Sequence, residues 1–282
     1  MKIYVLGGSM EFSVLMSVYK NDNSVFFEMA LQSIYDKQTL KPNQVVLVLD
    51  GPVPNEINVI IENFTNRNPG ILTLVPLKKN VGLGEALRVG TTHCEYPIIC
   101  RMDSDDISDG ERFEKQISYM RSHPDIDVLG SNILEFKNDV NEDFLMIREV
   151  PQSMNQITLF SKRRNPMNHV TVCMRKSAIE KSGGYETCLL LEDYYLWLKM
   201  IANGCKLENI NEPLVFVRVG NGFISKRSSK TRIKGWKKLQ VYMLDNHMVN
   251  RFEAMLNMLY ICAFVFTPNV IKGPLYKKFL RK

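Results

Sequence analysis

The sequence predicts an α/β fold in which a mostly parallel β-sheet is flanked by helices. Within residues 12–102, short apolar segments typical of buried strands alternate with segments of helical periodicity. Strands and helices that alternate in this way form right-handed crossovers, and the resulting parallel sheet is covered on both faces. The chain has 282 residues and a hydrophobic content of 45%, enough for a full core.

The first half of the chain contains four expected strands, each followed by polar residues. The strands are expected at residues 12–18, 44–49, 71–76 and 97–102, and the helices between them at residues 24–35, 53–66 and 83–94. Ligands of parallel sheets bind outside the carboxyl ends of the strands. We therefore expect one rim of the sheet to collect the polar residues that follow these strands, namely Ser17 to Asn21, Asp50, Asn80 and Asp103 to Asp106.

The second half is expected to add shorter elements and then to change to helices only. Helices are expected at residues 111–122, 176–181 and 192–203, and strands at residues 128–136, 168–174, 205–207 and 214–219. Residues 139–149 are expected to form a hairpin or a loop. Beyond Arg227 the pattern is purely helical. The sequence thus predicts a domain at residues 1–225 and a C-terminal helical region at residues 226–282.

The C-terminal region is strongly basic. From Lys226 onward, 13 basic residues face two acidic ones, a net charge of +11, whereas the rest of the chain carries about −5. Apolar and aromatic residues are mixed with these charges, which is typical of helices that lie on an anionic membrane. A helical cap on the first domain, or a dimer interface, would use the same residues. No nucleic-acid partner is expected, because the aromatic residues lie in helical runs rather than on a strand platform.

Nothing in the sequence points to export or to a membrane span. Residues 1–6 are too short for a signal peptide, and the apolar stretch at residues 255–266 is shorter than the roughly 18 to 20 residues that a spanning helix needs. The six cysteines form no Cys-x-x-Cys pair, so free thiols in a reducing compartment are expected. We expect a cytoplasmic protein, peripheral on the inner face of the cytoplasmic membrane.

Three carboxylates follow the fourth expected strand, at Asp103, Asp105 and Asp106. Side chains two positions apart on an extended backbone point to the same side, so Asp103 and Asp105 converge. Two ionised carboxylates at this separation repel each other unless a cation lies between them. Carboxylate oxygens are suitable ligands for Mg²⁺ or Mn²⁺. The alternative is an acidic turn, since Asp and Ser are common in turns. Asp106 alternates away from the pair and fits a structural role in the turn.

Three further positions each allow a structural and a functional interpretation. Gly82, in the segment Asn80 to Leu87, either lets the backbone approach a ligand at a helix start or simply suits a tight turn. Glu192 and Asp193 either complement the dipole of an expected helix or supply a carboxylate that accepts a substrate proton. His169 is either a core histidine or a ligand.

In order and spacing, five segments together resemble glycosyltransferase family 2, whose members have the GT-A fold. The segments are residues 12–21, Val48 to Gly51, Asn80 to Leu83, Met102 to Asp106, and Glu192 with Asp193. The resemblance covers roughly residues 12–220. It implies a metal-dependent, inverting transferase that uses a UDP-hexose, such as UDP-Gal or UDP-Glc, and Mn²⁺ or Mg²⁺. The similar sequences suggest a polyprenyl-diphosphate-linked acceptor in bacterial O-antigen or exopolysaccharide synthesis.

The resemblance also implies roles for individual residues. Asp193 would be the general base, and Asp103 and Asp105 would bind the metal. His169 and Glu192 would lie on the acceptor side. Arg218 and Arg227 are candidates for pairing with the diphosphate, or else are charges on the solvated surface. The residues expected to bind the nucleotide-sugar are Ser17, Tyr19, Asp50, Asn80, Gly82, Arg101 and Asp103.

Two departures from the family pattern narrow the expected activity. Asp50-Gly51-Pro52 replaces the commoner Asp-Asp-Gly-Ser, so nucleotide contacts there can differ. No Gln-x-x-Arg-Trp motif follows Asp193, which favours transfer of a single sugar over polymer synthesis. Two alternatives stay open: a sugar nucleotidyltransferase, although Gly7-Gly8-Ser9 precedes the first strand and lacks the expected lysine, and a non-catalytic, membrane-bound nucleotide-sugar binding protein.

Overall fold

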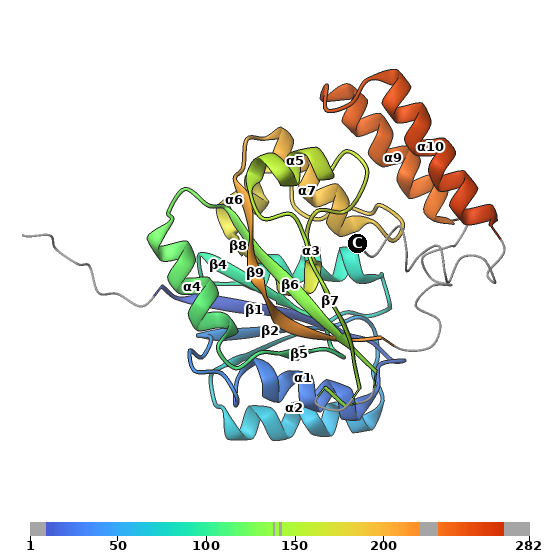
Figure 1. Cartoon of the computed structure of the whole chain (residues 1–282). Helices are drawn as coiled ribbons and strands as arrows, with labels where there is room; N and C mark the ends of the chain where they lie inside the picture. The colour runs from blue at the N-terminus through green and yellow to red at the C-terminus, as the bar shows by residue number, and fades with distance from the viewer. Residues whose placement is uncertain (1–9, 138, 141–142, 220–230, 268–282) are drawn as a thin grey trace, which may run out of the picture.

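One nine-stranded sheet runs through the molecule in the order β3-β2-β1-β4-β8-β6-β9-β5, with β7 paired to β6 (Figure 1). The computed structural model describes residues 10–137, 139–140, 143–219 and 231–267. Helices cover both faces of the sheet, and a separate pair of helices stands to one side (Figure 1). The α/β class and the flanking helices are confirmed.

The first four strands form the parallel half of the sheet. They are β1 (Phe12–Val18), β2 (Gln44–Leu49), β3 (Leu72–Pro76) and β4 (Ile98–Met102), and every pairing among them is parallel. All residues of β2 and β4 are buried, which explains their continuous apolar sequences. The carboxyl ends of these strands therefore share one rim.

Alternate residues of the parallel strands pack against helices on opposite faces. Helices α1 (Ser24–Ile34), α2 (Asn55–Arg67) and α4 (Arg112–Ser122) share a core with Val14 and Met16 of β1. Helices α3 (Leu83–His93), α6 (Lys176–Lys181) and α7 (Glu192–Ala202) share the other core with Leu15. The period of two along β1 thus separates the two cores.

The second half of the sheet is mixed and curls back toward the first. Strand β8 (Cys173–Arg175) is antiparallel to β4 and to β6 (Val128–Phe136). Strand β6 is parallel to β9 (Leu207–Arg218) and antiparallel to β7 (Phe144–Arg148). Strand β5 (Ile107–Ser108) pairs with β9 and also donates the Ser108 N–H to Ser33 Oγ of α1, 3.0 Å away. The end of β9 is thereby brought next to the end of β4.

Three expectations for this half were wrong in detail. Residues 168–174 are not one strand, because Asn168 caps the 3₁₀ turn η1 (His169–Thr171) before β8 begins. The two strands expected at residues 205–207 and 214–219 are one, since the polar Asn209 and Asn211 in between are hydrogen-bonded to Pro151 and Asn132. Helix α5 (Met154–Phe160) was not predicted: Ile157 is its one buried residue, although Ser153 and Gln156 form a capping box.

The C-terminal region forms a helical hairpin that packs on α7. Helices α9 (Thr231–Asp245) and α10 (Arg251–Phe266) share a cluster of buried apolar residues with that helix. None of the helices in the described ranges is both long and apolar enough to span a membrane. The boundary at residues 225 and 226 falls outside the described residues, so the domain division stays a prediction. All six cysteines are free thiols, as predicted.

Candidate active site

The acidic loop after β4, which we define as Asp103 to Asp106, carries three carboxylates at the rim of the sheet. Asp103 is partly exposed and its Oδ1 forms an ion pair with Nη2 of Arg101, whose side chain is buried on β4. Partial desolvation, together with the charges of Asp103 and Asp22, raises the pKa of Asp105 to about 6. The negative charge of Asp103 thus opposes ionisation of Asp105.

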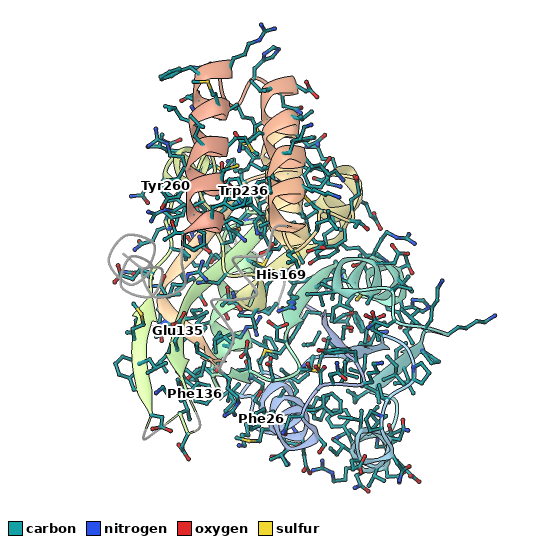
Figure 2. All side chains as sticks on the ribbon, turned by 90° about the vertical axis from the view of Figure 1, so that its right-hand side faces the viewer. Phe26, Glu135, Phe136, His169, Trp236 and Tyr260 are labelled. Carbon is teal, nitrogen blue, oxygen red and sulfur yellow. The ribbon has the colours of Figure 1, made fainter. Side chains whose placement is uncertain are left out.

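Asp106 and Arg218 fasten the acidic loop to the end of β9. Oδ1 of buried Asp106 accepts the Arg218 backbone N–H at 2.8 Å, and Arg218 Nε donates to the Asp105 carbonyl at 3.3 Å. The guanidinium lies over the rings of Phe26 and Phe136, with centroids 3.8 and 4.6 Å away. Figure 2 labels these two phenylalanines, which belong to α1 and to the end of β6. Burial and the adjacent carboxylates raise the pKa of Asp106 well above its ordinary value. The structure therefore places Arg218 against the acidic loop in a stacked position rather than on the solvated surface.

The turn between β3 and α3 is organised by Asp50 at the end of β2. Its Oδ1 accepts the Val81 N–H at 2.6 Å, and its Oδ2 accepts the Gly82 N–H and Asn80 Nδ2 at 3.0 Å each. Gly82 has φ +88, and a Cβ on Gly51 would lie 2.6 Å from the Asn80 nitrogen. Three predicted site residues thus meet in one turn, with the Asp50 carboxylate directed to the backbone and only 5% of the residue exposed.

The end of β1 is joined to the acidic loop by Asp22. Asp22 Oδ2 accepts the Tyr19 N–H at 3.1 Å and the Ser104 hydroxyl at 2.7 Å. Ser17 and Tyr19 are both partly exposed at this strand end. Sequence reasoning missed Asp22, although its position just after the first strand is the same signal that pointed to Ser17 and Tyr19.

Asp193, on the first turn of α7, is held by an asparagine from a distant segment. Asn165 donates from Nδ2 to Asp193 Oδ2 at 2.5 Å, across 28 residues of sequence. The neighbouring Glu192 packs on the start of α3, since a Cβ on Gly84 would lie 2.5 Å from Glu192 Cγ. The starts of α3 and α7, both predicted as functional, therefore touch.

His169 lies in a buried polar cluster between the acidic loop and α7. Its Nε2 is 2.8 Å from the hydroxyl of Tyr185, and its ring meets Trp197 edge-on at 5.9 Å. Burial and the nearby Arg101 charge lower the pKa of His169 well below its usual value, so it is neutral. Burial raises the pKa of Tyr185, a residue that the sequence did not single out, and the charges of Arg101, Asp193 and Asp103 act on it to a smaller extent. Tyr185 thus joins His169 in the cluster beside α7.

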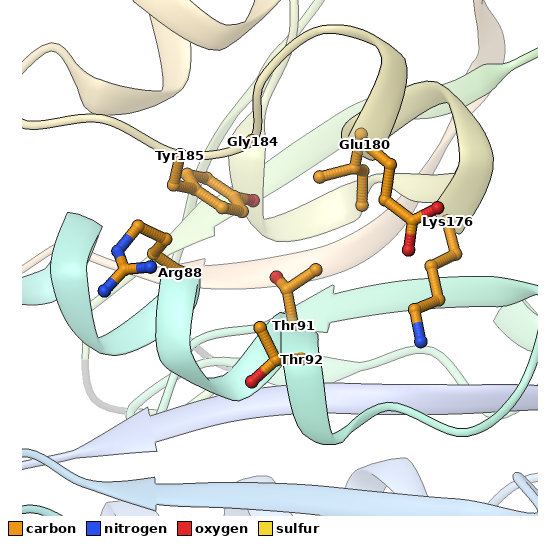
Figure 3. Close-up of a pocket in the computed structure, with 8 residues that line it drawn as sticks. Arg88, Thr91, Thr92, Lys176, Glu180, Gly184 and Tyr185 are labelled. Atoms are coloured by element: carbon orange, nitrogen blue, oxygen red, sulfur yellow. The ribbon is translucent and has the colours of Figure 1, made fainter.

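A pocket of about 260 Å³ lies beside this cluster, between α3 and α6 (Figure 3). It is lined by Arg88, Thr91, Thr92, Lys176, Ile179, Glu180, Gly184 and Tyr185. None of these residues was predicted as part of the site. Arg227, the other diphosphate candidate, lies outside the described residues. Within the described ranges no group of three His, Cys, Asp or Glu side chains could hold a metal ion by itself.

Comparison with solved structures supports the fold. The chain matches Staphylococcus aureus TarS residues 1–349 bound to UDP-GlcNAc with a TM-score of 0.65 and 20% identity, covering 96% of this chain and 76% of that one. Of a longer TarS chain it covers 46%. It also matches the mannosyltransferase PcManGT from Pyrobaculum calidifontis, in complex with GDP-Man and Mn²⁺, with a TM-score of 0.62 and 14% identity over 95% of this chain and 78% of that one. The fold is thus the GT-A fold.

Comparison with known sequences supports the family. The chain is 39% identical to the amylovoran biosynthesis glycosyltransferase AmsE of Erwinia amylovora, over 83% of this chain and 85% of AmsE. It is 35% identical to the UDP-Gal:alpha-D-GlcNAc-diphosphoundecaprenol beta-1,3-galactosyltransferase of Escherichia coli, over 96% and 97% of the two chains. The family model "Glycosyl transferase family 2" matches residues 13–182. The chain therefore belongs to glycosyltransferase family 2.

Proposed function

We propose that the protein transfers one hexose from a UDP-sugar, with inversion, to a hydroxyl of a sugar carried on a lipid diphosphate. The observation that carries this proposal is the contact between the start of α7, which carries Asp193, and the start of α3, next to the turn that Asp50 holds at the rim where Asp103 lies. Group transfer from a nucleotide-sugar needs one acidic site for the donor diphosphate and a separate base for the acceptor. The acidic loop would supply the first, and Asp193 the second.

Asp103 and Asp105 fit a divalent cation that is shared with the substrate. Their carboxylates are two residues apart, and the described part of the chain adds no third ligand to form a closed site. Mg²⁺ and Mn²⁺ commonly bind one or two carboxylates and take their remaining ligands from substrate phosphates and water. When bound, such a cation would neutralise charge on the leaving nucleoside diphosphate. Arg101 and Arg218, fixed beside the acidic loop, would add positive charge near it.

Asp193 is suited to act as the general base. Asn165 donates to Oδ2 and so orients the carboxylate, and the residue is partly exposed at the first turn of α7. We assign Oδ1 as the atom that takes the proton of the acceptor hydroxyl. As this proton moves to Asp193, the hydroxyl oxygen attacks the anomeric carbon from the face opposite the diphosphate. An α-linked donor would then give a β-glycoside.

The remaining predicted residues surround these two groups. Ser17 and Tyr19, at the end of β1, and the turn of Asn80 and Gly82 would bind the nucleotide. Asp50 would shape that turn, because its oxygens already accept three N–H groups. His169, neutral and close to Tyr185, would line the acceptor side together with Glu192.

The nature of donor and acceptor is supported by the relatives. The galactosyltransferase from Escherichia coli, named for a UDP-Gal donor and a diphosphoundecaprenol-linked acceptor, aligns over nearly the whole of both chains. AmsE is named for exopolysaccharide biosynthesis. We propose UDP-Gal or UDP-Glc as donor, a polyprenyl-diphosphate-linked sugar as acceptor, and a role in bacterial O-antigen or exopolysaccharide assembly.

A lipid-linked acceptor requires the site to work at a membrane surface. Helix α10 carries a row of exposed apolar residues on the side away from α7; we define this outer face as Phe252, Met255, Leu256, Leu259, Tyr260 and Phe266. Their spacings of three, four and seven residues place them on one stripe of the helix. The C-terminal region is also strongly basic. We propose that this face lies on the anionic inner surface of the cytoplasmic membrane.

One assay tests the reaction as a whole. The purified protein is incubated with Mn²⁺, with UDP-Gal, UDP-Glc or GDP-Man, and with GlcNAc-diphosphate carried on a polyprenyl chain. Mass spectrometry should show addition of one hexose from a UDP-sugar, and proton NMR of the product should show a β-linkage. Addition of several sugars, an α-linkage, or no transfer from either UDP-hexose would contradict the proposal.

A further inference from the structure

We infer that the α9–α10 hairpin positions the catalytic carboxylate Asp193, with Asn257 and Gly235 as the positioning residues. This inference rests on the proposed role of Asp193. The hairpin contacts two segments that hold this carboxylate in place. One segment, residues 161–165, carries Asn165; the other, residues 188–191, runs directly into α7.

Asn257 of α10 holds the first segment. Its Nδ2 donates to the Lys162 carbonyl at 2.9 Å and to Gln240 Oε1 of α9 at 3.1 Å. Only 9% of Asn257 and 3% of Gln240 are exposed, so water has little access to these two hydrogen bonds. Lys162 lies three residues before Asn165, whose amide binds Asp193 Oδ2. The hydrogen bonds thus run from α9 and α10 to the backbone that presents Asn165.

Gly235 allows the backbone of α9 to lie close against the backbone of the second segment and so to fix it. A Cβ at this position would lie 2.8 Å from the Cys188 carbonyl oxygen and 2.9 Å from that of Leu189. Leu189 and Leu190 have φ of +37 and +70, a conformation that costs energy for residues other than glycine. Such a conformation persists only where surrounding structure holds it. The backbone of α9 at Gly235 lies directly against that strained turn.

Tyr194 links the two segments beside Asp193. Its hydroxyl donates to the Ser161 carbonyl at 2.6 Å, and its ring meets Trp236 of α9 edge-on at 5.6 Å. The residue directly after Asp193 is therefore fixed both to the first segment and to the hairpin. A small shift of the hairpin moves Asn165 and the start of α7 together, and misplacement of a reacting group by about 1 Å can cost roughly 10²-fold in rate.

Two variants test the inference. Asn257→Ala removes the donor to the Lys162 carbonyl, and Gly235→Ala pushes the 188–191 backbone away while improving the helix propensity of α9. For both we expect kcat to fall about tenfold, with KM for the UDP-sugar within about twofold of wild type. Asn246→Ala is the matched control, because the exposed Asn246 amide donates to the Tyr242 carbonyl of its own helix. It should keep the wild-type kcat.

The measurements are steady-state kinetics and urea unfolding followed by circular dichroism. Reduced kcat at an unchanged donor KM, in a variant that is folded under assay conditions, supports positioning. Wild-type kcat in both folded variants, while Asp193→Asn is inactive, overturns the positioning role and leaves the base assignment intact. Full activity of Asp193→Asn overturns the base assignment itself. A loss of activity that matches the unfolded fraction in both variants also overturns positioning, because the hairpin then acts on stability alone.

Discussion

The proposed donor side and the proposed acceptor side of the site are built in different ways. On the donor side, the acidic loop follows β4, and the turn of Asp50 and Asn80 follows β2 and β3; these parallel strands are held in register within one sheet. On the acceptor side, Asp193 is held by Asn165 and by a loop that packs on α9. The donor groups are fixed by the sheet, whereas the base is fixed by contacts between segments far apart in the sequence.

This difference has a consequence for function. A nucleoside diphosphate is common to many transferases, and a rigid strand rim suits a constant ligand. An acceptor sugar differs between transferases, and segments outside the sheet can change without disturbing the strands. We therefore expect changes on the acceptor side to affect turnover, and changes on the donor side to affect nucleotide binding.

The largest effect is expected for the base. Asp193→Asn keeps the shape of the side chain but cannot take a proton, so kcat should fall about 10³-fold. Steady-state transfer to the lipid-linked acceptor measures this. Asp125→Asn is a control, since Asp125 pairs with Lys206 on the surface. Retention of more than a tenth of the wild-type kcat in Asp193→Asn would place the base elsewhere.

Removal of the metal should be the next largest effect. Dialysis against EDTA, or Asp105→Asn, takes away part of the charge that stabilises the leaving diphosphate, and we expect about a 10²-fold loss of transfer. Mn²⁺ should restore the dialysed wild-type protein but not the variant. Full activity in EDTA would mean that Arg101 and Arg218 are enough to stabilise the leaving diphosphate. Asp103 and Asp105 would then only shape the turn.

A smaller effect is expected when Asp50, which holds the turn after β3, is replaced. Asp50→Ala removes the acceptor of three N–H groups and should lower the free energy of unfolding by about 2 kcal/mol. KM for the UDP-sugar should rise several-fold while kcat changes little. Urea unfolding and donor-dependent kinetics measure the two quantities. Asp50→Asn keeps one acceptor oxygen and should fall between wild type and Asp50→Ala; an unchanged KM in both would separate this turn from the nucleotide.

The smallest effect on the reaction itself is expected at the outer face of α10. Leu259→Ser combined with Tyr260→Ser should weaken binding to vesicles that contain phosphatidylglycerol about tenfold, because less apolar surface leaves water. Transfer to a short, water-soluble acceptor should not change. Val241→Ser removes an exposed apolar residue of α9 outside this face and serves as the control. Equal vesicle binding, combined with loss of a dimer in sedimentation, would instead assign the face to a second copy.

The two sides of the site also differ in how far they could be predicted from the sequence. Parallel strands buried on both faces give continuous apolar segments, so the four strands and the polar residues at their ends were found from local pattern. The acidic loop, Asp50 and Asn80 were therefore placed on one rim. Asp22 carried the same signal and was overlooked.

The acceptor side carries little local signal. Asn165 and Asp193 lie 28 residues apart, and Asn257 and Lys162 lie 95 apart. Hydrogen bonds between residues so far apart leave no periodic pattern in the sequence. The break predicted within β9 failed for a related reason, because partners from other segments satisfy its polar residues. The sequence also left open whether the C-terminal helices cap the first domain, and in the structure the inner side of the hairpin packs on α7.

The separation of donor binding from the base can be tested most directly by calorimetric titration of UDP, in the presence of Mn²⁺, into wild type, Asp193→Asn and Asp103→Asn. We expect equal affinity for wild type and Asp193→Asn, and affinity lowered at least tenfold for Asp103→Asn, because only the latter removes a charge that holds the diphosphate. The reverse pattern, with UDP binding lost in Asp193→Asn and kept in Asp103→Asn, would contradict the assignment of the two sides.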